Sequence, residues 1–176
     1  MAQLAHGHAG IACGAFAGGT ASCGYPCFPG RCGPLVLKEY PMKNKPVLEF
    51  SDVTRIALAA QAEAVRNHWA VCIAIVDDGG HLLHLQRLDG AAATAATIAS
   101  AKANTAALGR RESKVYEEMV NGGRVSFLSA PSLQGLLEGG VPIMVDGQCI
   151  GAVGVSGVKS SEDAQVAKAG IAALAL

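Results

Sequence analysis

Two histidines near the middle of the chain, His81 and His84, are the residues best suited to bind a metal ion. A neutral imidazole nitrogen is a common ligand of such ions. Side chains three positions apart on a regular strand face opposite sides, so only one of the two would bind a given ion unless the strand bulges. The ordinary alternative is that each is a partly exposed hairpin histidine.

Charged residues further along the chain are candidates for binding a carboxylate. Arg87 and Asp89 flank Leu88 and would share a face if a strand continued through them. The guanidinium could orient a bound carboxylate, or the pair could be a structural salt bridge. Lys102 is a lone positive charge in an alanine-rich segment, and Thr105 lies on the same helical face. Together these two could meet a carboxylate or a propionate.

Glycines in the last third of the chain indicate a crevice. Two β-rich runs flank Asp146-Gly147, which suits a tight hairpin turn. Glycine in a strand lets a ligand or another backbone approach closely, and the N-terminus of a following helix near Ser160 would favour an anion there. We therefore expect a ligand-binding strand end whose contact residues include Gly140, Gly154 and Gly157.

The first 41 residues differ in composition from the rest. They hold four of the six cysteines and show neither helical nor strand periodicity, so we expect an irregular extension. Their spacing misses the common zinc patterns, which leaves Cys23, Cys27 and Cys32 as weak metal-ligand candidates beside disulfides or an incidental tail. Met42 resembles an ordinary start. We expect a domain over residues 42–176 and a read-through extension before it, which the intact mass of native protein would test.

Periodicity and turn residues predict one α+β domain. The first helix should be capped by Ser51 and end near Asn67. The order of elements lacks the βαβ alternation of a parallel sheet and favours an antiparallel sheet flanked by helices. The expected elements are strands over 70–76 and 81–87, helices over 92–108 and 113–120, a loop over 126–138, strands over 141–145 and 149–155, and a helix over 161–174.

Five motifs occur in an order that resembles one family. They are VDDGG at 76–80, QRLDGA at 86–91, KANTA at 102–106, GGVPI at 139–143 and IGAVGVSG at 150–157. With these motifs, residues 50–176 resemble the GlcG/HbpS-like family, a haem-binding or "haem-degrading" domain also found at the C-terminus of PduO-type proteins. The resemblance implies a profilin-like arrangement, homo-oligomers, and a haem site near the helix that carries Thr105. Thr105 therefore joins His81 and His84 as a candidate haem ligand.

Composition excludes several classes of function. Equal numbers of acidic and basic residues leave no basic field for nucleic acid. There is no apolar run long enough to span a membrane. The N-terminal residues do not have the pattern of a secretory signal, so we expect a cytoplasmic protein.

We therefore expect a homo-oligomer that binds a small molecule, first of all haem, in haem sensing, storage or degradation. The alternatives are an enzyme or accessory protein of a catabolic operon that acts on a small organic acid or diol, and a structural subunit of a larger enzyme complex. The alanine-rich helix suits close contact between subunits. We expect a dimer or a larger assembly, up to a hexamer or octamer, with the helix over 91–107 or the glycine-rich strand end at the interface, so that Arg at Ala95 or Ala99 would break it down if the helix lies there.

Overall fold

The computed structural model describes residue 42 and residues 44–174, all within the unit Met42–Leu176. The expectations for residues 1–41, including Cys23, Cys27 and Cys32, lie outside the described residues. The elements are α1 (Phe50–Arg66), β1 (Cys72–Asp77), β2 (Leu82–Arg87), α2 (Ala93–Gly109), α3 (Lys114–Asn121), the 3-10 helix η1 (Val125–Ser129), β3 (Gly140–Val145), β4 (Gln148–Ser156) and α4 (Ser160–Ala172).

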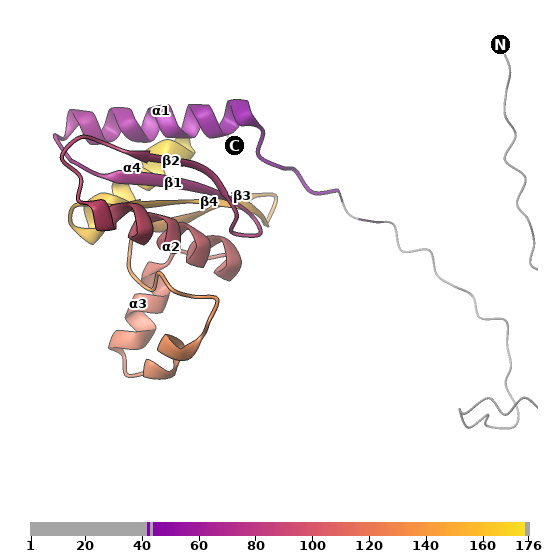
Figure 1. Ribbon diagram of the computed structural model, residues 1–176. Helices are drawn as coiled ribbons and strands as arrows, with labels where there is room; N and C mark the ends of the chain where they lie inside the picture. The colour runs from indigo at the N-terminus through magenta and orange to yellow at the C-terminus, as the bar shows by residue number, and fades with distance from the viewer. Residues whose placement is uncertain (1–41, 43, 175–176) are drawn as a thin grey trace, which may run out of the picture. The chain divides into compact units, whose positions relative to one another are not determined.

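The four strands form one sheet in the order β2-β1-β4-β3, with every neighbouring pair antiparallel. Helices α1 and α4 cover one face, and α2 covers the other (Figure 1). The central strand β1 serves both layers, because Ile73 and Ile75 pack under α1 and α4 while Cys72, Ala74 and Val76 pack under α2. The α+β antiparallel fold expected from the sequence is thus confirmed.

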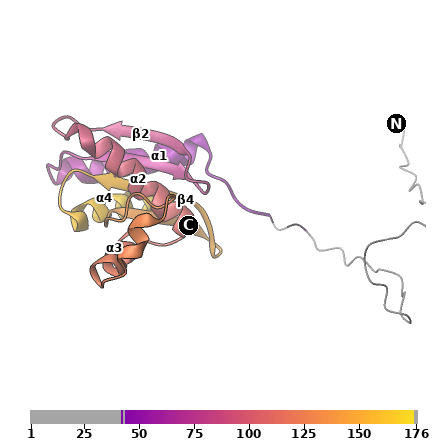
Figure 2. The ribbon, with the colours of Figure 1, turned by 60° about the horizontal axis from the view of Figure 1, so that its bottom comes forward.

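The element boundaries agree with the sequence within a few residues, with two differences. Glu49, rather than Ser51, is the N-cap of α1, because the Asp52 carboxylate accepts the Glu49 backbone N–H at 3.1 Å. The segment expected to be a loop over 126–138 begins with most of η1, which follows α3 on the outer side of α2 (Figure 2). No helix among the described residues is long and apolar enough to cross a membrane.

The buried alanines of α2 lie against the sheet of their own subunit. Ala95 is 3% exposed and Ala99 is fully buried, with Ala103 and Ala106 beside them. Beneath them, a Cβ atom on Gly154 would lie 2.2 Å from the Ala99 carbonyl oxygen. Ala95 and Ala99 are therefore not available to a subunit interface, because these small side chains let α2 approach β4 inside one subunit; the interface itself stays a prediction.

The two outer edges of the sheet differ. The Val155 N–H donates to the Gly139 carbonyl at 3.0 Å, so the backbone groups of Gly139 face β4. Inward and outward positions alternate along an antiparallel strand. Pro142, three residues further along, therefore has its backbone nitrogen on the outer edge of β3. Proline has no N–H to offer there. The outer edge of β2 contains no proline, and its leucines are partly exposed.

Candidate functional site

An open groove of about 520 Å³ lies between α2, the β1–β2 hairpin and the loop at 131–134. Its volume falls within the usual range for small-molecule sites. The hairpin contributes Gly80 and Leu82, and the Asn104 amide donates to the Gly80 carbonyl at 3.2 Å, which holds the hairpin against α2. The described lining residues carry no formal charge; the polar ones are Thr97, Ser100, Asn104, Ser132 and Gln134.

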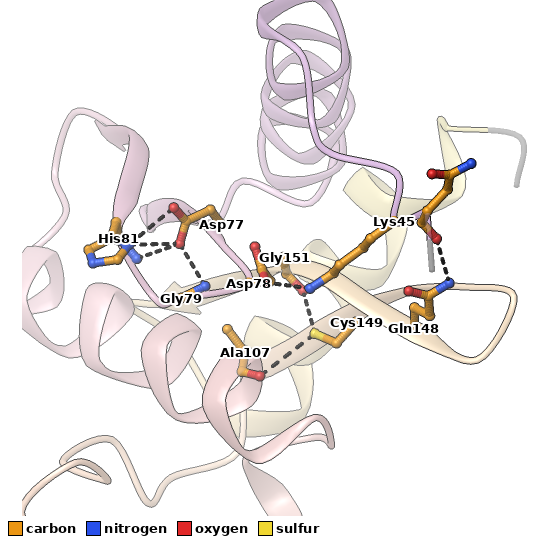
Figure 3. Close-up of polar contacts among 10 residues, drawn as sticks. Lys45, Asp77, Asp78, Gly79, His81, Ala107, Gln148, Cys149 and Gly151 are labelled. Atoms are coloured by element: carbon orange, nitrogen blue, oxygen red, sulfur yellow. Dashed lines mark hydrogen bonds and ion pairs between the residues drawn. The ribbon is translucent and has the colours of Figure 1, made fainter. Parts of the chain in front are cut away.

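A carboxylate and an imidazole form a pair at the hairpin turn (Figure 3). The Nδ1 atom of His81 lies 3.2 and 3.1 Å from the two carboxylate oxygens of Asp77. Asp77 Oδ1 also accepts the backbone N–H groups of Gly79 and His81 at 2.9 and 2.8 Å. The His81 side chain is 82% exposed. With Nδ1 bound by the carboxylate, the Nε2 atom is the one left to meet a ligand.

Asp77 is held in its ionised form. Burial tends to raise its pKa, but the hydrogen bonds from the His81 backbone and ring and from the Gly79 backbone outweigh burial and lower the pKa overall. An ionised carboxylate beside Nδ1 favours the tautomer with the proton on Nδ1. The lone pair of the His81 ring then lies on Nε2, as metal ligation requires.

His84 is less accessible than His81. It lies opposite Ile75, on the face of the sheet that α1 covers, and its Nε2 atom is buried with no hydrogen-bond partner. A bulge shifts the register between the two histidines, since Ile75 pairs with His84 but Val76 pairs with Leu82. The strict alternation assumed from the sequence therefore does not apply between them. What separates them is exposure.

Lys102 and Thr105 are engaged within the protein. The Lys102 ammonium lies 2.8 Å from the Asp163 carboxylate and 3.0 Å from the Val155 carbonyl, and the Lys102 and Asp163 side chains are only 3% and 2% exposed. The Thr105 hydroxyl accepts the Gly135 N–H at 3.1 Å, and the residue is fully buried. The structure thus places both next to protein partners rather than in the groove.

The glycines expected to line a crevice lie against backbone. A Cβ atom on Gly140 would lie 2.3 Å from the Lys102 carbonyl oxygen, and one on Gly157 would lie 2.4 Å from the Ala70 carbonyl oxygen. Together with Gly154, they permit close approach of other parts of the same chain. A glycine in a strand leaves room for either a ligand or another backbone segment. At these glycines, backbone of the same chain occupies that room.

Arg87 and Asp89 are not paired with each other in the described structure. β2 ends at Arg87, and Asp89 lines a separate open groove of about 460 Å³ with His68 and Trp69. Arg87 lies opposite Cys72, whose side chain packs under α2, so Arg87 is on the α2 face of the sheet.

Sequence reasoning missed the polar residues of α2 that line the groove. Thr97, Ser100 and Asn104 follow one another at three- and four-residue intervals, so they share one helical face. That interval was the available signal, and the surrounding alanines hid it. The contribution of Pro131 and Ser132 had no local signal, because it depends on how the loop returns over α2.

Comparisons with known proteins agree with this fold. The family model described as "Haem degrading protein HbpS-like" matches residues 48–172. Protein GlcG of Escherichia coli strain K12 is 59% identical over 115 residues, covering 65% of this chain and 85% of that protein. An uncharacterised 15.0 kDa protein encoded in the dhaT-dhaS intergenic region of Citrobacter freundii is 33% identical over 117 residues, covering 65% of this chain and 82% of that protein.

Solved structures show the same arrangement of elements. The Klebsiella pneumoniae protein ORFY superposes with a TM-score of 0.71 at 25% identity, covering 78% of this chain and 98% of its own. HbpS gives a TM-score of 0.70 at 28% identity, covering 76% and 94%. A PduOC:haem complex gives 0.67 at 28% identity, covering 73% and 95%. With the family model matched over more than half of its residues, the chain belongs to the HbpS-like family.

Proposed function

We propose that the protein binds haem at the end of the β1–β2 hairpin, beside the open groove that α2 lines, with the Nε2 atom of His81 as ligand of the iron. The observation that carries this proposal is the Asp77–His81 pair: an exposed imidazole whose Nδ1 atom is bound by a carboxylate. Histidines that bind metals commonly have such a partner on their second nitrogen. His81 does not itself line the groove: Asp77, which its ring contacts, follows Val76 along β1 and so faces the α1 side of the sheet, and the imidazole stands at the hairpin end beside the groove.

The groove offers surfaces that suit the two kinds of chemistry on a porphyrin. Leu82 and Leu108 are 52% and 41% exposed and give apolar area for the ring. The Thr97 hydroxyl, and the Asn104 amide hydrogen that is not bound to the Gly80 carbonyl, can donate hydrogen bonds to propionates. Bound haem would supply an iron centre, and the residues of this chain would hold and orient it. This suits a role in haem sensing, storage or assistance to its degradation.

The relatives support the same ligand. The family description names a haem-degrading protein, and one of the similar structures is a complex with haem. In line with the sequence, we propose a cytoplasmic homo-oligomer of two or more copies.

The test is a titration of the full chain with haemin, followed by the Soret band. We expect His81→Ala to lose the ligand-dependent shift of the band. His68→Ala is the matched control, because His68 is also exposed but lines a different groove. His84→Ala and Thr105→Ala test the other two candidate ligands. A wild-type spectrum from His81→Ala would refute ligation by His81.

A second candidate ligand is a small diol. The specific observation is that the described polar residues lining the groove are all neutral hydroxyls and amides. Such groups suit a neutral hydroxylated metabolite better than an organic acid, which would lack a cation there. Calorimetry with a panel of diols and hydroxy acids would test this, and heat from the acids alone would contradict it.

A further inference from the structure

Among the described residues, no backbone hydrogen bond is made to the outer edge of β2, and the positions of its outward groups follow from the register. The Leu88 N–H donates to the Val71 carbonyl at 3.0 Å, and β2 pairs with β1 in regular register from His84 to Arg87. Inward and outward positions alternate along an antiparallel strand. His84 and Gln86 therefore direct their N–H and C=O groups toward β1, whereas Leu85 and Arg87 direct theirs away from the sheet.

The same edge exposes apolar side chains. Leu82, Leu83 and Leu85 are 52%, 44% and 43% exposed, and β2 contains neither proline nor acidic residues. Open edges of this kind act as templates for pairing with another strand. The opposite edge of the sheet has Pro142 at an outward position. The two edges therefore differ in their capacity to pair.

We propose that β2 pairs antiparallel with β2 of a second copy of this chain, centred on Leu85, and that Arg87 of the second copy completes the groove beside α2. The interface itself is argued from the strand edge alone. The role of Arg87 rests on the function proposed above.

The register follows from two-fold symmetry. An axis through Leu85, perpendicular to the sheet, pairs Leu85 with its own copy, and the two residues exchange N–H···O bonds because both face outward. Leu83 of one copy then lies opposite Arg87 of the other. This centre leaves the bulge beside Leu83 at the end of the paired segment.

The charge of Arg87 argues for a second copy of this chain as the partner. Leu85 lies opposite Ala74, and Arg87 opposite Cys72, so both side chains are on the α2 face. A two-fold axis perpendicular to the sheet keeps the α2 faces of both copies on the same side. Arg87 of the second copy therefore lies beside Leu83 and close to Leu82, at the rim of the groove. The described lining of the groove has no charge of its own. A propionate or another carboxylate would thus receive its cation from the second copy.

The interface is tested with the full chain by light scattering. Leu85→Pro removes an N–H that faces outward and leaves the bonds to β1 in place, so we expect a lower mass with an unchanged circular dichroism spectrum. If that variant does not fold, Leu85→Glu places two carboxylates opposite each other and should give the same result. Met144→Glu is the control, because Met144 is 39% exposed on β3, at the opposite edge of the sheet, and should keep the wild-type mass.

The role of Arg87 is tested by mixing variants. We expect Arg87→Ala to keep the wild-type mass and to weaken haemin binding by about tenfold, the effect of one charge-assisted hydrogen bond. In a mixed dimer of Arg87→Ala with His81→Ala, one of the two sites has both wild-type residues: His81 comes from the Arg87→Ala copy, and Arg87 comes from the His81→Ala copy. Such dimers should recover wild-type affinity at one groove, and no recovery would overturn the shared site.

The outcomes separate the two proposals. A monomeric wild type, or Leu85 variants that fold and keep the wild-type mass, overturns the interface even if haemin still binds. A wild type that does not bind haemin, with Leu85 variants of lower mass, supports the interface and refutes the proposed function.

Discussion

Asp77 is the residue on which the geometry of His81 depends. Its Oδ1 atom accepts two backbone N–H groups from the hairpin turn, so the carboxylate that contacts the imidazole is itself fixed in place. The sequence identified His81 and His84 as candidates but gave no reason to choose between them. Their exposure depends on the bulge and on the cover from α1, which single-residue patterns do not report.

Asp77→Asn should weaken haemin binding by about tenfold to a hundredfold, the usual effect of removing a partner on the second nitrogen of a ligating histidine. The amide keeps the size of the side chain but removes the charge that favours the Nδ1–H tautomer. Asp78→Asn is the matched control, because Asp78 pairs with Lys45 rather than with His81. Haemin titrations of the two variants would check this, and equal affinities would contradict it.

At the scale of elements, α2 and β4 are joined by small residues on both sides. Gly154 lies opposite Ala74 in the sheet and beneath Ala99 and Ala103 of α2. With no side chain at position 154, the helix backbone comes close to the strand backbone. The groove beside α2 depends on this approach, because Asn104 reaches the hairpin from the same helix.

Gly154→Ala should therefore destabilise the domain, by about 1–3 kcal/mol in the free energy of unfolding, as expected for overpacking. The added Cβ atom would lie 2.2 Å from the Ala99 carbonyl oxygen and 2.5 Å from the Ala103 nitrogen. Gly147→Ala is the comparison. Its Cβ atom would meet nothing within 4 Å, so its cost comes only from the positive φ of +75° and should be about 1–2 kcal/mol. Urea unfolding measures both, and a stable Gly154→Ala protein would argue against tight contact.

The elements themselves were largely predictable, and the groove was not. Alternating apolar residues and the Asp146-Gly147 turn are local signals, so both hairpins were found in the sequence. From the sequence, Gly140, Gly154 and Gly157 are predicted ligand contacts, but a strand glycine permits either a ligand or a backbone to approach. Only the packed structure shows that the neighbouring atoms come from Lys102, Ala99 and Ala70.

For the whole molecule, one buried ion pair connects the layers on the two faces of the sheet. Lys102 belongs to α2 and Asp163 to α4, and the Lys102 ammonium also contacts the Val155 carbonyl of β4. Asp163 Oδ1 accepts the Val158 N–H at 3.2 Å, just before α4 begins. The charge that the sequence marked as a ligand contact thus holds the three layers together.

Lys102→Met should lower the free energy of unfolding by about 3–5 kcal/mol, because it leaves a buried carboxylate unpaired. Burial raises the pKa of Asp163 above 3.8, against the lowering by Lys102. A raised pKa means that the stability contributed by protonated Asp163 is present at low pH and lost as the pH rises through that pKa. Without Lys102 the pKa should rise further, so the deficit should be largest near neutral pH and shrink on acidification.

Urea unfolding of both proteins across this pH range measures the deficit. Lys102→Met combined with Asp163→Leu is the control, because it removes both charges and should recover part of the loss. A deficit that stays constant with pH would show that the lost packing of the lysine stem, rather than the unpaired carboxylate, causes the destabilisation.

The unequal edges of the sheet limit which assemblies can form. Pairing through β2, as proposed, would use the only edge of the described sheet that lacks a proline, so the joined sheet would end at Pro142 on both sides and would not grow into a fibre. Any larger closed particle must then be built from such pairs through other surfaces. Its number of copies would be even, which admits hexamers and octamers and excludes a trimer or a pentamer.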